Sequence, residues 1–202
     1  MVMILDKTSS EPSLDLLCSG TPGTALKIVE ADVTEPATQT YRTSRFGTIE
    51  VPEDLVITLP EGIIGFDQCR RYVILRNDDR SDFRWLQSLD APAIAFPILN
   101  PSTFRPDYAP TIGDIDALLL GMSDTSPMLV FAVITIPPNN ARGMTANLLA
   151  PLVINPVTRE GKQVIVLDEG FTTRHSVLEE IERMRTLATS QRSKRGRSER
   201  AA

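Results

Sequence analysis

Few side chains in this sequence are of the kinds that carry out catalysis or bind metals. His175 is the single histidine and the cysteines, Cys18 and Cys69, stand far apart, so the clustered ligands of a zinc site are missing. A serine nucleophile of the hydrolase kind needs a Gly-x-Ser-x-Gly turn and phosphate binding needs a glycine-rich loop, and the sequence contains neither. Adjacent carboxylates such as Asp78 and Asp79 are typical of solvated turns. We therefore expect no enzyme activity, no metal, no cofactor and a structural role for His175.

Polar side chains within apolar segments are the remaining candidates for a functional role. Gln87 closely follows Trp85, and Asn147 interrupts a run of small apolar residues. One interpretation gives these amides a hydrogen bond to a strand edge or loop, and gives Asn100 and Asn155, which each precede a proline, an ordinary turn. The other interpretation is a protein-binding surface with aromatic anchors. Its contact residues would be Trp85, Gln87, Asn100, Phe104, Tyr108, Asn147 and Asn155.

Charge is distributed unevenly along the chain. Residues 1–40 carry a net charge of −4 and residues 190–202 one of +4, which leaves −5 on residues 41–189. An acidic domain repels phosphate backbones, so we expect that the domain does not bind nucleic acid directly. A basic protein is the better electrostatic match.

Composition and termini predict a cytoplasmic protein. The cysteines have no paired spacing, as in a reducing compartment, and the first residues lack a basic leader and a long apolar run, so we expect no signal peptide. No apolar run approaches the roughly 20 residues of a membrane-spanning helix. With 202 residues, 42% of them hydrophobic, the chain can bury one sizeable core.

The most apolar stretch predicts a hairpin with a first arm over residues 144–155 and a return arm over residues 161–167. Alternate residues of the first arm share one buried face. Asn155 and Pro156 open the turn, and the β-branched run at 164–167 belongs in the core. A hairpin this apolar needs other strands to cover it.

Further short strands, bounded by turn residues, complete the domain. They are expected over residues 41–46, 48–51, 56–59, 72–75, 83–89, 93–99 and 128–136, the last buried on both faces. Pro97 indicates an edge or bulge in its strand. Apolar residues at helical spacing predict a short helix over 112–120. The pattern predicts an all-β fold: a small antiparallel β-barrel-like domain with one short internal helix and an added C-terminal helix.

The two ends of the chain differ from this domain, which is expected over residues 39–175. Residues 1–38 mix Ser, Thr, Pro, Gly and acids without periodicity and predict a disordered extension. The C-terminal segment 176–190 predicts a helix over about 177–189. Residues 191–202 form a basic tail, expected to be disordered and solvated, with RNA contact as the alternative.

The predicted C-terminal helix has a clear start and an apolar side. Ser176 and Glu179 have the spacing of a capping box, and Glu179 stands four residues before Arg183, the spacing of an ion pair. Its apolar stripe packs on the barrel or binds a partner.

Blocks of sequence from about residue 41 to residue 176 resemble the bacterial flagellar assembly factor FliW family. The matching blocks are 46–50, 59–66, 85–88, 100–101, 144–151, 154–156, 161–164 and 173–175. The most specific signal is Thr-Ala-Asn-Leu-Leu-Ala-Pro at 145–151, followed shortly by Gly-Lys-Gln at 161–163. The N-terminal extension and everything past about Val177 lie outside the resemblance.

The resemblance implies a small β-barrel-like protein without enzymatic activity. Members of this family bind the translational repressor CsrA and stop it silencing flagellin mRNA, away from its RNA-binding surface. They also bind flagellin, so rising free flagellin removes them from the repressor. The alternative is a chaperone-like barrel that binds flagellin and has no repressor partner.

Overall fold

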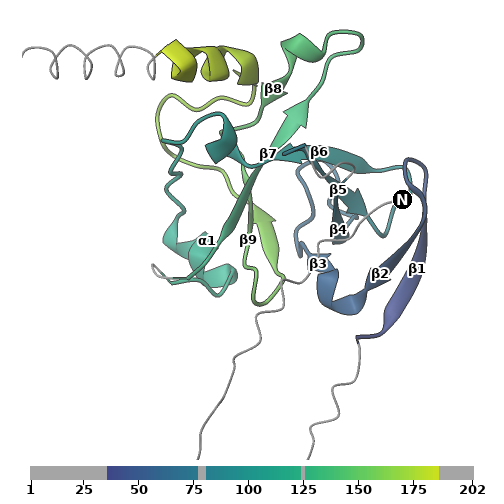
Figure 1. The fold of residues 1–202 in the computed structure, drawn as a ribbon. Helices are drawn as coiled ribbons and strands as arrows, with labels where there is room; N and C mark the ends of the chain where they lie inside the picture. The colour runs from purple at the N-terminus through teal and green to yellow at the C-terminus, as the bar shows by residue number, and fades with distance from the viewer. Residues whose placement is uncertain (1–35, 77–80, 124–125, 187–202) are drawn as a thin grey trace, which may run out of the picture.

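A curved antiparallel sheet forms the body of the protein in the computed structural model, which describes residues 36–76, 81–123 and 126–186 (Figure 1). The strand order along the sheet is β10-β9-β7-β6-β5-β4-β3. These strands are β3 (Ile57–Thr58), β4 (Arg71–Arg76), β5 (Arg84–Ser88), β6 (Ala95–Leu99), β7 (Leu129–Thr135), β9 (Leu152–Ile154) and β10 (Gly161–Gln163). Two short strands branch from it: β8 (Thr145–Ala146) pairs with β7, and β11 (His175–Ser176) pairs with β8.

The two ends of this sheet meet. Thr58 of β3 forms a parallel bridge with Glu160, which directly precedes β10, and the Thr58 N–H donates to the carbonyl of Arg159 at 2.9 Å. A sheet whose end strands meet encloses its inward-facing side chains, as a barrel does. The predicted all-β, barrel-like antiparallel fold is confirmed.

A separate hairpin covers one side of the sheet. It consists of β1 (Thr38–Thr43) and β2 (Gly47–Pro52), and Gly47 supplies the positive φ of 69° that the turn requires. Its apolar side chains pack on β4 and β5, in a cluster of Ile49, Val51, Val56, Val73 and Leu75 with Trp85 against it. The strands predicted over 41–46 and 48–51 are present, the first of them shifted toward the N-terminus, and they pair with each other.

Two larger apolar clusters fill the domain. The first lies within the curved sheet and includes Ile57, Leu59, Tyr72, Leu86, Ile98, Phe131, Leu152 and Ile154. The second lies beside β7, β8 and the C-terminal helix and includes Leu99, Phe104, Tyr108, Ala132, Ile134, Leu148 and Val177. Each large side chain buried in this way stabilises the fold by about 1.5–3 kcal/mol.

Helical segments are short. They are α1 (Asp114–Leu119), three 3-10 turns, η1 (Glu53–Leu55), η2 (Pro101–Thr103) and η3 (Ala141–Gly143), and the helical residues 177–186 at the end of the described chain, hereafter the C-terminal helix. The positions of the helices predicted over 112–120 and from 177 onward are thus confirmed. Residues 1–35 of the extension predicted over 1–38, the turn at Asp78 and Asp79, the end of the helix predicted over 177–189 and the tail over 191–202 lie outside the described residues. Strand β1 begins at Thr38, the last residue of the predicted extension.

One expectation about burial holds only in part. Strand β7 is buried on both faces at its centre, where Phe131 and Ala132 are 3% and 0% exposed, but Leu129 at its start is 41% exposed. Helix α1 exposes Ile115 and Leu118, at 75% and 79%, and Leu120 is buried just beyond its end.

The predicted apolar hairpin is in the right place, but its arms are shorter than expected. Gly161 pairs with Ile154, so the two arms do meet. The first arm is divided into β8 and β9 by a turn in which the Asn147 side chain accepts a hydrogen bond from the Ala150 N–H at 2.9 Å. The return strand ends at Gln163, before the β-branched run that was expected to form it, and Leu167 is 88% exposed.

The two Asn-Pro pairs hold turns of different burial. Asn100 is exposed and accepts a hydrogen bond from the Ser102 N–H at 3.0 Å, which caps η2. Asn155 is 5% exposed; its Nδ2 donates to the Leu120 carbonyl and its Oδ1 accepts from the Val157 N–H, both at 2.9 Å. Asn155 therefore ties the end of α1 to the β9–β10 turn.

Replacing these two residues should separate a buried hydrogen-bonding role from an exposed one. We expect Asn155→Ala to lower the free energy of unfolding by about 2–4 kcal/mol, because it leaves a buried carbonyl and N–H without partners. The matched change Asn100→Ala should cost about 1 kcal/mol, the value of one exposed cap. Urea unfolding of both variants measures the difference, and equal losses would contradict this assignment.

Candidate functional site

Three of the sequence blocks that resemble the FliW family meet at one apolar groove, hereafter the motif groove. It is lined by residues from 63–66, 147–150 and 163–165, together with Phe96 of β6, Val133 of β7 and Thr173, and it encloses about 360 Å³. Residues 63–66 precede residues 163–165 by about a hundred positions in the sequence, so the groove depends on the tertiary fold. Its walls are mostly apolar side chains, which suits an apolar segment of another molecule.

The loop that supplies residues 63–66 requires a glycine. Gly62 has a φ of +72°, and a Cβ placed on it would lie 2.7 Å from the carbonyl oxygen of Phe66. This tight turn places Ile63 in the core and sets the Phe66 ring edge-on to Phe96, with centroids 5.0 Å apart. The Gly-Ile-Ile-Gly-Phe block therefore forms one wall of the groove.

Gln163 joins the two walls of the groove. Its Oε1 accepts from the Ile64 N–H at 3.0 Å, and its Nε2 donates to the Ala150 carbonyl, also at 3.0 Å. Asn147 shapes the same side, since its backbone N–H donates to the Val133 carbonyl while its side chain makes the turn toward Ala150. These amides hold the shape, and the apolar ends of Ile64 and Ile165, 60% and 61% exposed, face solvent.

Pro97 explains why the groove is open on the β6 side. Strand β6 is internal, but its pairing with β7 covers Ile98 and Leu99 and stops before the proline. Because proline has no N–H, it cannot continue such a ladder. The neighbouring Phe96 then faces the groove. The edge-like behaviour predicted for Pro97 therefore holds on one side of its strand.

Of the seven residues predicted to contact a partner, Asn147 lines the motif groove. Gln87, Phe104, Tyr108 and Asn155 are buried, with exposed fractions of 0–8%. Gln87 donates to the carbonyls of Ser88 and Ile94 at 2.8 and 3.0 Å, and the Tyr108 hydroxyl donates to the Leu148 carbonyl at 2.7 Å. These four side chains lie in the interior and stabilise the fold. For Gln87 this is the hydrogen-bonding interpretation of the sequence analysis.

Trp85 and Asn100 lie elsewhere on the molecule. Trp85 is half-buried beneath Arg45, whose guanidinium carbon lies 3.6 Å from the ring centroid, a cation–π contact. Asn100 is exposed at η2. The structure does not bring the seven predicted residues together. The groove residues that the prediction missed, Ile64, Gln163 and Ile165, all belong to or adjoin the sequence blocks already recognised.

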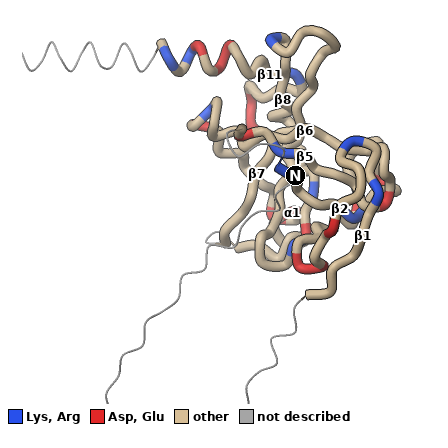
Figure 2. Tube along the Cα trace, turned by 45° about the vertical axis from the view of Figure 1, so that its right-hand side comes forward, with Lys and Arg blue, Asp and Glu red and all other residues tan. Residues whose placement is uncertain are grey.

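A charged cluster fixes the C-terminal helix to the domain. The Glu180 carboxylate, with its side chain 11% exposed, lies 2.7 Å from His175 Nε2, 3.3 Å from Arg105 Nη1 and 2.8 Å from Arg183 Nε. Asp107 lies 3.6 Å from Arg105 and 3.8 Å from Arg183. Figure 2 shows the acidic and basic residues of this helix following one another along its described turns.

The position of one hydrogen on the His175 ring follows from this geometry. A carboxylate can only accept hydrogen bonds, so His175 Nε2 carries a hydrogen and donates to Glu180. Arg105 Nη1 lies 2.8 Å from the same nitrogen, but it cannot donate to a nitrogen that already carries a hydrogen. Arg105 Nη1 donates instead to the Glu180 carboxylate. The structural role predicted for His175 fits this arrangement. In the part of the chain that the structure describes, no three His, Cys, Asp or Glu side chains are grouped as metal ligands.

The predicted helix cap at Ser176 is confirmed, but the predicted ion pair between Glu179 and Arg183 is wrong. The Ser176 hydroxyl accepts from the Glu179 N–H at 3.4 Å, as a capping residue does. Arg183 pairs with Glu180, three residues before it, rather than with Glu179. The apolar side of the helix packs on the domain, since Val177 is 2% exposed and Ile181 contacts the same cluster. The apolar stripe of this helix therefore packs on the domain, which is the first of the two predicted alternatives.

Comparison with known proteins identifies the fold and its blocks. The family model described as "FliW protein" matches residues 40–177, which is more than half of the chain. The chain belongs to the FliW family. The motif groove lies entirely within the matched residues, and the C-terminal helix lies almost entirely beyond them.

Members of the family are similar along most of their length. The chain is 40% identical over 144 residues to the flagellar assembly factor FliW of Alkaliphilus metalliredigens, covering 71% of this chain and 88% of that protein. It is 39% identical to the protein of the same name from Bdellovibrio bacteriovorus, covering 69% and 79%. A crystal structure of the flagellar assembly factor FliW superposes with a TM-score of 0.64 at 30% identity, over 69% of this chain and 96% of that one. The chain is therefore a member of a family of flagellar assembly factors.

None of the helices in the described residues combines the length and the apolar character needed to cross a membrane.

The charged cluster predicts a pH-dependent contribution to stability. Burial raises the pKa of Glu180, but the hydrogen bonds from His175 and Arg183 and the charge of Arg105 lower it by more, so the net pKa shift is downward. A carboxyl whose pKa is depressed on folding stabilises the protein above its unfolded pKa of about 4.3, and this contribution is lost as the pH falls through the folded value.

We expect Glu180→Gln to lower the free energy of unfolding at pH 7 by about 1–3 kcal/mol, and by less at pH 3. The matched change Glu179→Gln, one residue earlier and exposed, should have little effect at either pH. Urea unfolding at the two pH values measures both. A loss for Glu180→Gln that is the same at pH 3 and pH 7 would contradict the ionised role of this carboxyl.

Proposed function

We propose that this protein is a cytoplasmic flagellar assembly factor that binds flagellin and antagonises a CsrA-type translational repressor, so that flagellin mRNA is released for translation. The observation that carries the proposal is the meeting of the family's sequence blocks at the motif groove, which is within the part matched by the family model. No catalytic grouping competes with this interpretation in the sequence.

The groove supports flagellin as one partner. Ile64 and Ile165 are large apolar residues that are more than half exposed at its rim. Removing such side chains from water lowers the free energy of a complex, and contiguous apolar surface is typical of protein-binding sites. An apolar segment of unassembled flagellin would cover these residues. The polar atoms of Gln163 are already engaged within the chain, so binding would not leave them without partners.

The charge of the domain supports the repressor as the other partner. Residues 41–189 carry a net charge of −5, and a repressor that binds RNA presents basic surface. Of the predicted contact residues, Trp85, Asn100 and Asn147 retain accessible surface and remain candidates for direct contact with a partner. Gln87, Phe104, Tyr108 and Asn155 would contribute by positioning those surfaces.

Flagellin binding should depend on the groove rim and not on exposed apolar residues in general. We expect Ile165→Glu to weaken binding to flagellin at least about tenfold, since it places a charge in an apolar contact. Leu167→Glu is the matched control, because Leu167 is 88% exposed two residues away and does not line the groove. Titration calorimetry with purified flagellin measures both variants. If they bind equally well, the groove is not the flagellin site.

Repressor antagonism is tested separately from flagellin binding. Adding the protein to a complex of CsrA-type repressor and flagellin mRNA should release the RNA in a gel-shift assay, and flagellin should reverse the release. Flagellin binding without any release of RNA would overturn the regulatory part of the proposal and leave the chaperone-like alternative.

Electrostatic steering makes the repressor association sensitive to salt. We expect the association rate to fall by about tenfold or more between low salt and 0.5 M salt, because charges more than about 8 Å apart are screened already at physiological ionic strength. Stopped-flow mixing at several salt concentrations measures the rate. A rate that does not change with salt would argue for an apolar repressor interface.

A further inference from the structure

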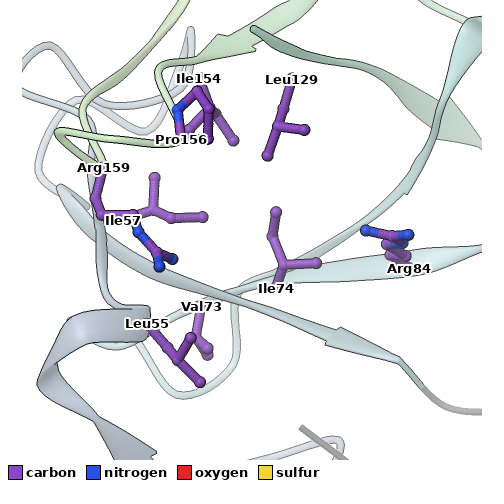
Figure 3. A pocket seen from close by; sticks show the side chains of 9 residues that line it. All are labelled: Leu55, Ile57, Val73, Ile74, Arg84, Leu129, Ile154, Pro156 and Arg159. Atoms are coloured by element: carbon purple, nitrogen blue, oxygen red, sulfur yellow. The ribbon is translucent and has the colours of Figure 1, made fainter. Parts of the chain in front are cut away.

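A second hollow lies apart from the motif groove and shares no lining residue with it. It encloses about 240 Å³ near the place where the two ends of the sheet meet, with Ile57 of β3, Ile74 of β4 and Ile154 of β9 in its wall (Figure 3). Leu55, Val73, Leu129 and Pro156 complete an apolar lining. The remaining two lining residues are Arg84 and Arg159. We call this hollow the arginine pocket.

The two guanidinium groups approach the pocket from opposite sides. In Figure 3 the side chain of Arg159 extends beside Ile57, and that of Arg84 stands across the hollow beyond Ile74. Arg84 lies over the Phe131 ring at 5.7 Å, and within the described residues neither guanidinium is seen in an ion pair with a carboxylate. Cations beside an apolar wall are costly unless an anion is near.

The two arginines are unusual in different ways. The pKa of Arg84 is lowered by its burial and by the charge of Arg76, with Asp82 opposing both. Arg159 has a φ of +63°, a conformation that favours glycine or asparagine over a residue with a long side chain. Its backbone carbonyl accepts the bond from Thr58 that closes the sheet, and glycine could do the same. The backbone of this turn therefore does not require an arginine side chain at position 159.

We propose that the arginine pocket binds a small carboxylate with an apolar tail, of the medium-chain fatty acid class. The apolar wall would cover the tail, and a planar guanidinium matches a carboxylate through two parallel hydrogen bonds. The volume, about 240 Å³, is slightly below the usual range of ligand pockets, about 300–1,000 Å³, which favours a small molecule over a folded partner. This site is independent of the proposed function, since flagellin and the repressor are assigned to other surfaces.

Titration calorimetry of the full chain with octanoate tests the site. We expect saturable binding of one octanoate per chain, and binding weakened at least about tenfold for octanol, which lacks the charge, and for octyltrimethylammonium, which reverses it. Arg84→Gln should also weaken octanoate binding at least about tenfold. The control Arg42→Gln, which changes an exposed arginine on β1, should leave it unchanged.

Arg159→Gly distinguishes a binding role from a structural one. Because glycine accepts a positive φ without strain, this variant should be at least as stable as the parent chain in thermal unfolding without ligand, while octanoate binding falls at least about tenfold. Absence of saturable octanoate binding, equal binding of octanol, or full octanoate affinity in a folded Arg159→Gly chain would each overturn the proposal. No flagellin or repressor enters these measurements, so their outcome is separate from that of the proposed function.

Discussion

The side-chain amide of Gln163 is the interaction on which the functional surface depends. With one oxygen and one nitrogen it joins the backbone of Ile64 to that of Ala150, at 3.0 Å each. These two segments have no strand pairing with each other, so without the amide they would be held only by apolar contacts, which do not fix direction. The groove keeps its shape because polar groups inside the walls are satisfied, and its apolar residues remain free to contact a partner.

The rest of the fold serves the same arrangement. Closure of the sheet at Thr58 and Glu160 brings the β10 end of the chain, which carries Gln163, next to the loop after β3, which carries Ile64. Pro97 ends the β6–β7 ladder beside the groove, and Gly62 allows the tight turn opposite. Glu180 and Val177 attach the C-terminal helix to Arg105 and to the cluster that contains Phe104 and Tyr108. The described residues of this helix, 177–186, do not line the groove.

Much of this fold could be predicted from the sequence because local patterns decide it. Alternation of apolar residues located most strands, and the Ser176 hydroxyl located the start of the last helix. The failures occurred where tertiary contacts decide which apolar residues are buried. In the run at 164–167, which was predicted to lie in the core, Val164 and Val166 are buried, whereas Ile165 and Leu167 are exposed.

The candidate site was harder to predict, for a physical reason. A polar residue in an apolar strand serves either the interior or a partner, and the sequence does not distinguish them. Gln87 bonds to nearby carbonyls inside the chain, whereas Asn147 lines the groove. The groove itself combines residues about a hundred positions apart, so only the folded chain brings them together. The recognised sequence blocks marked its components without indicating that they adjoin.

The central claim is that partner binding covers the motif groove, and hydrogen exchange of the full chain with and without flagellin tests it most directly. The account predicts that backbone amides of residues 63–66, 147–150 and 163–165 become more protected in the complex, while those of α1 and of the β1–β2 hairpin exchange as before. Protection confined to α1 or the hairpin, with the three groove segments unchanged, would contradict it.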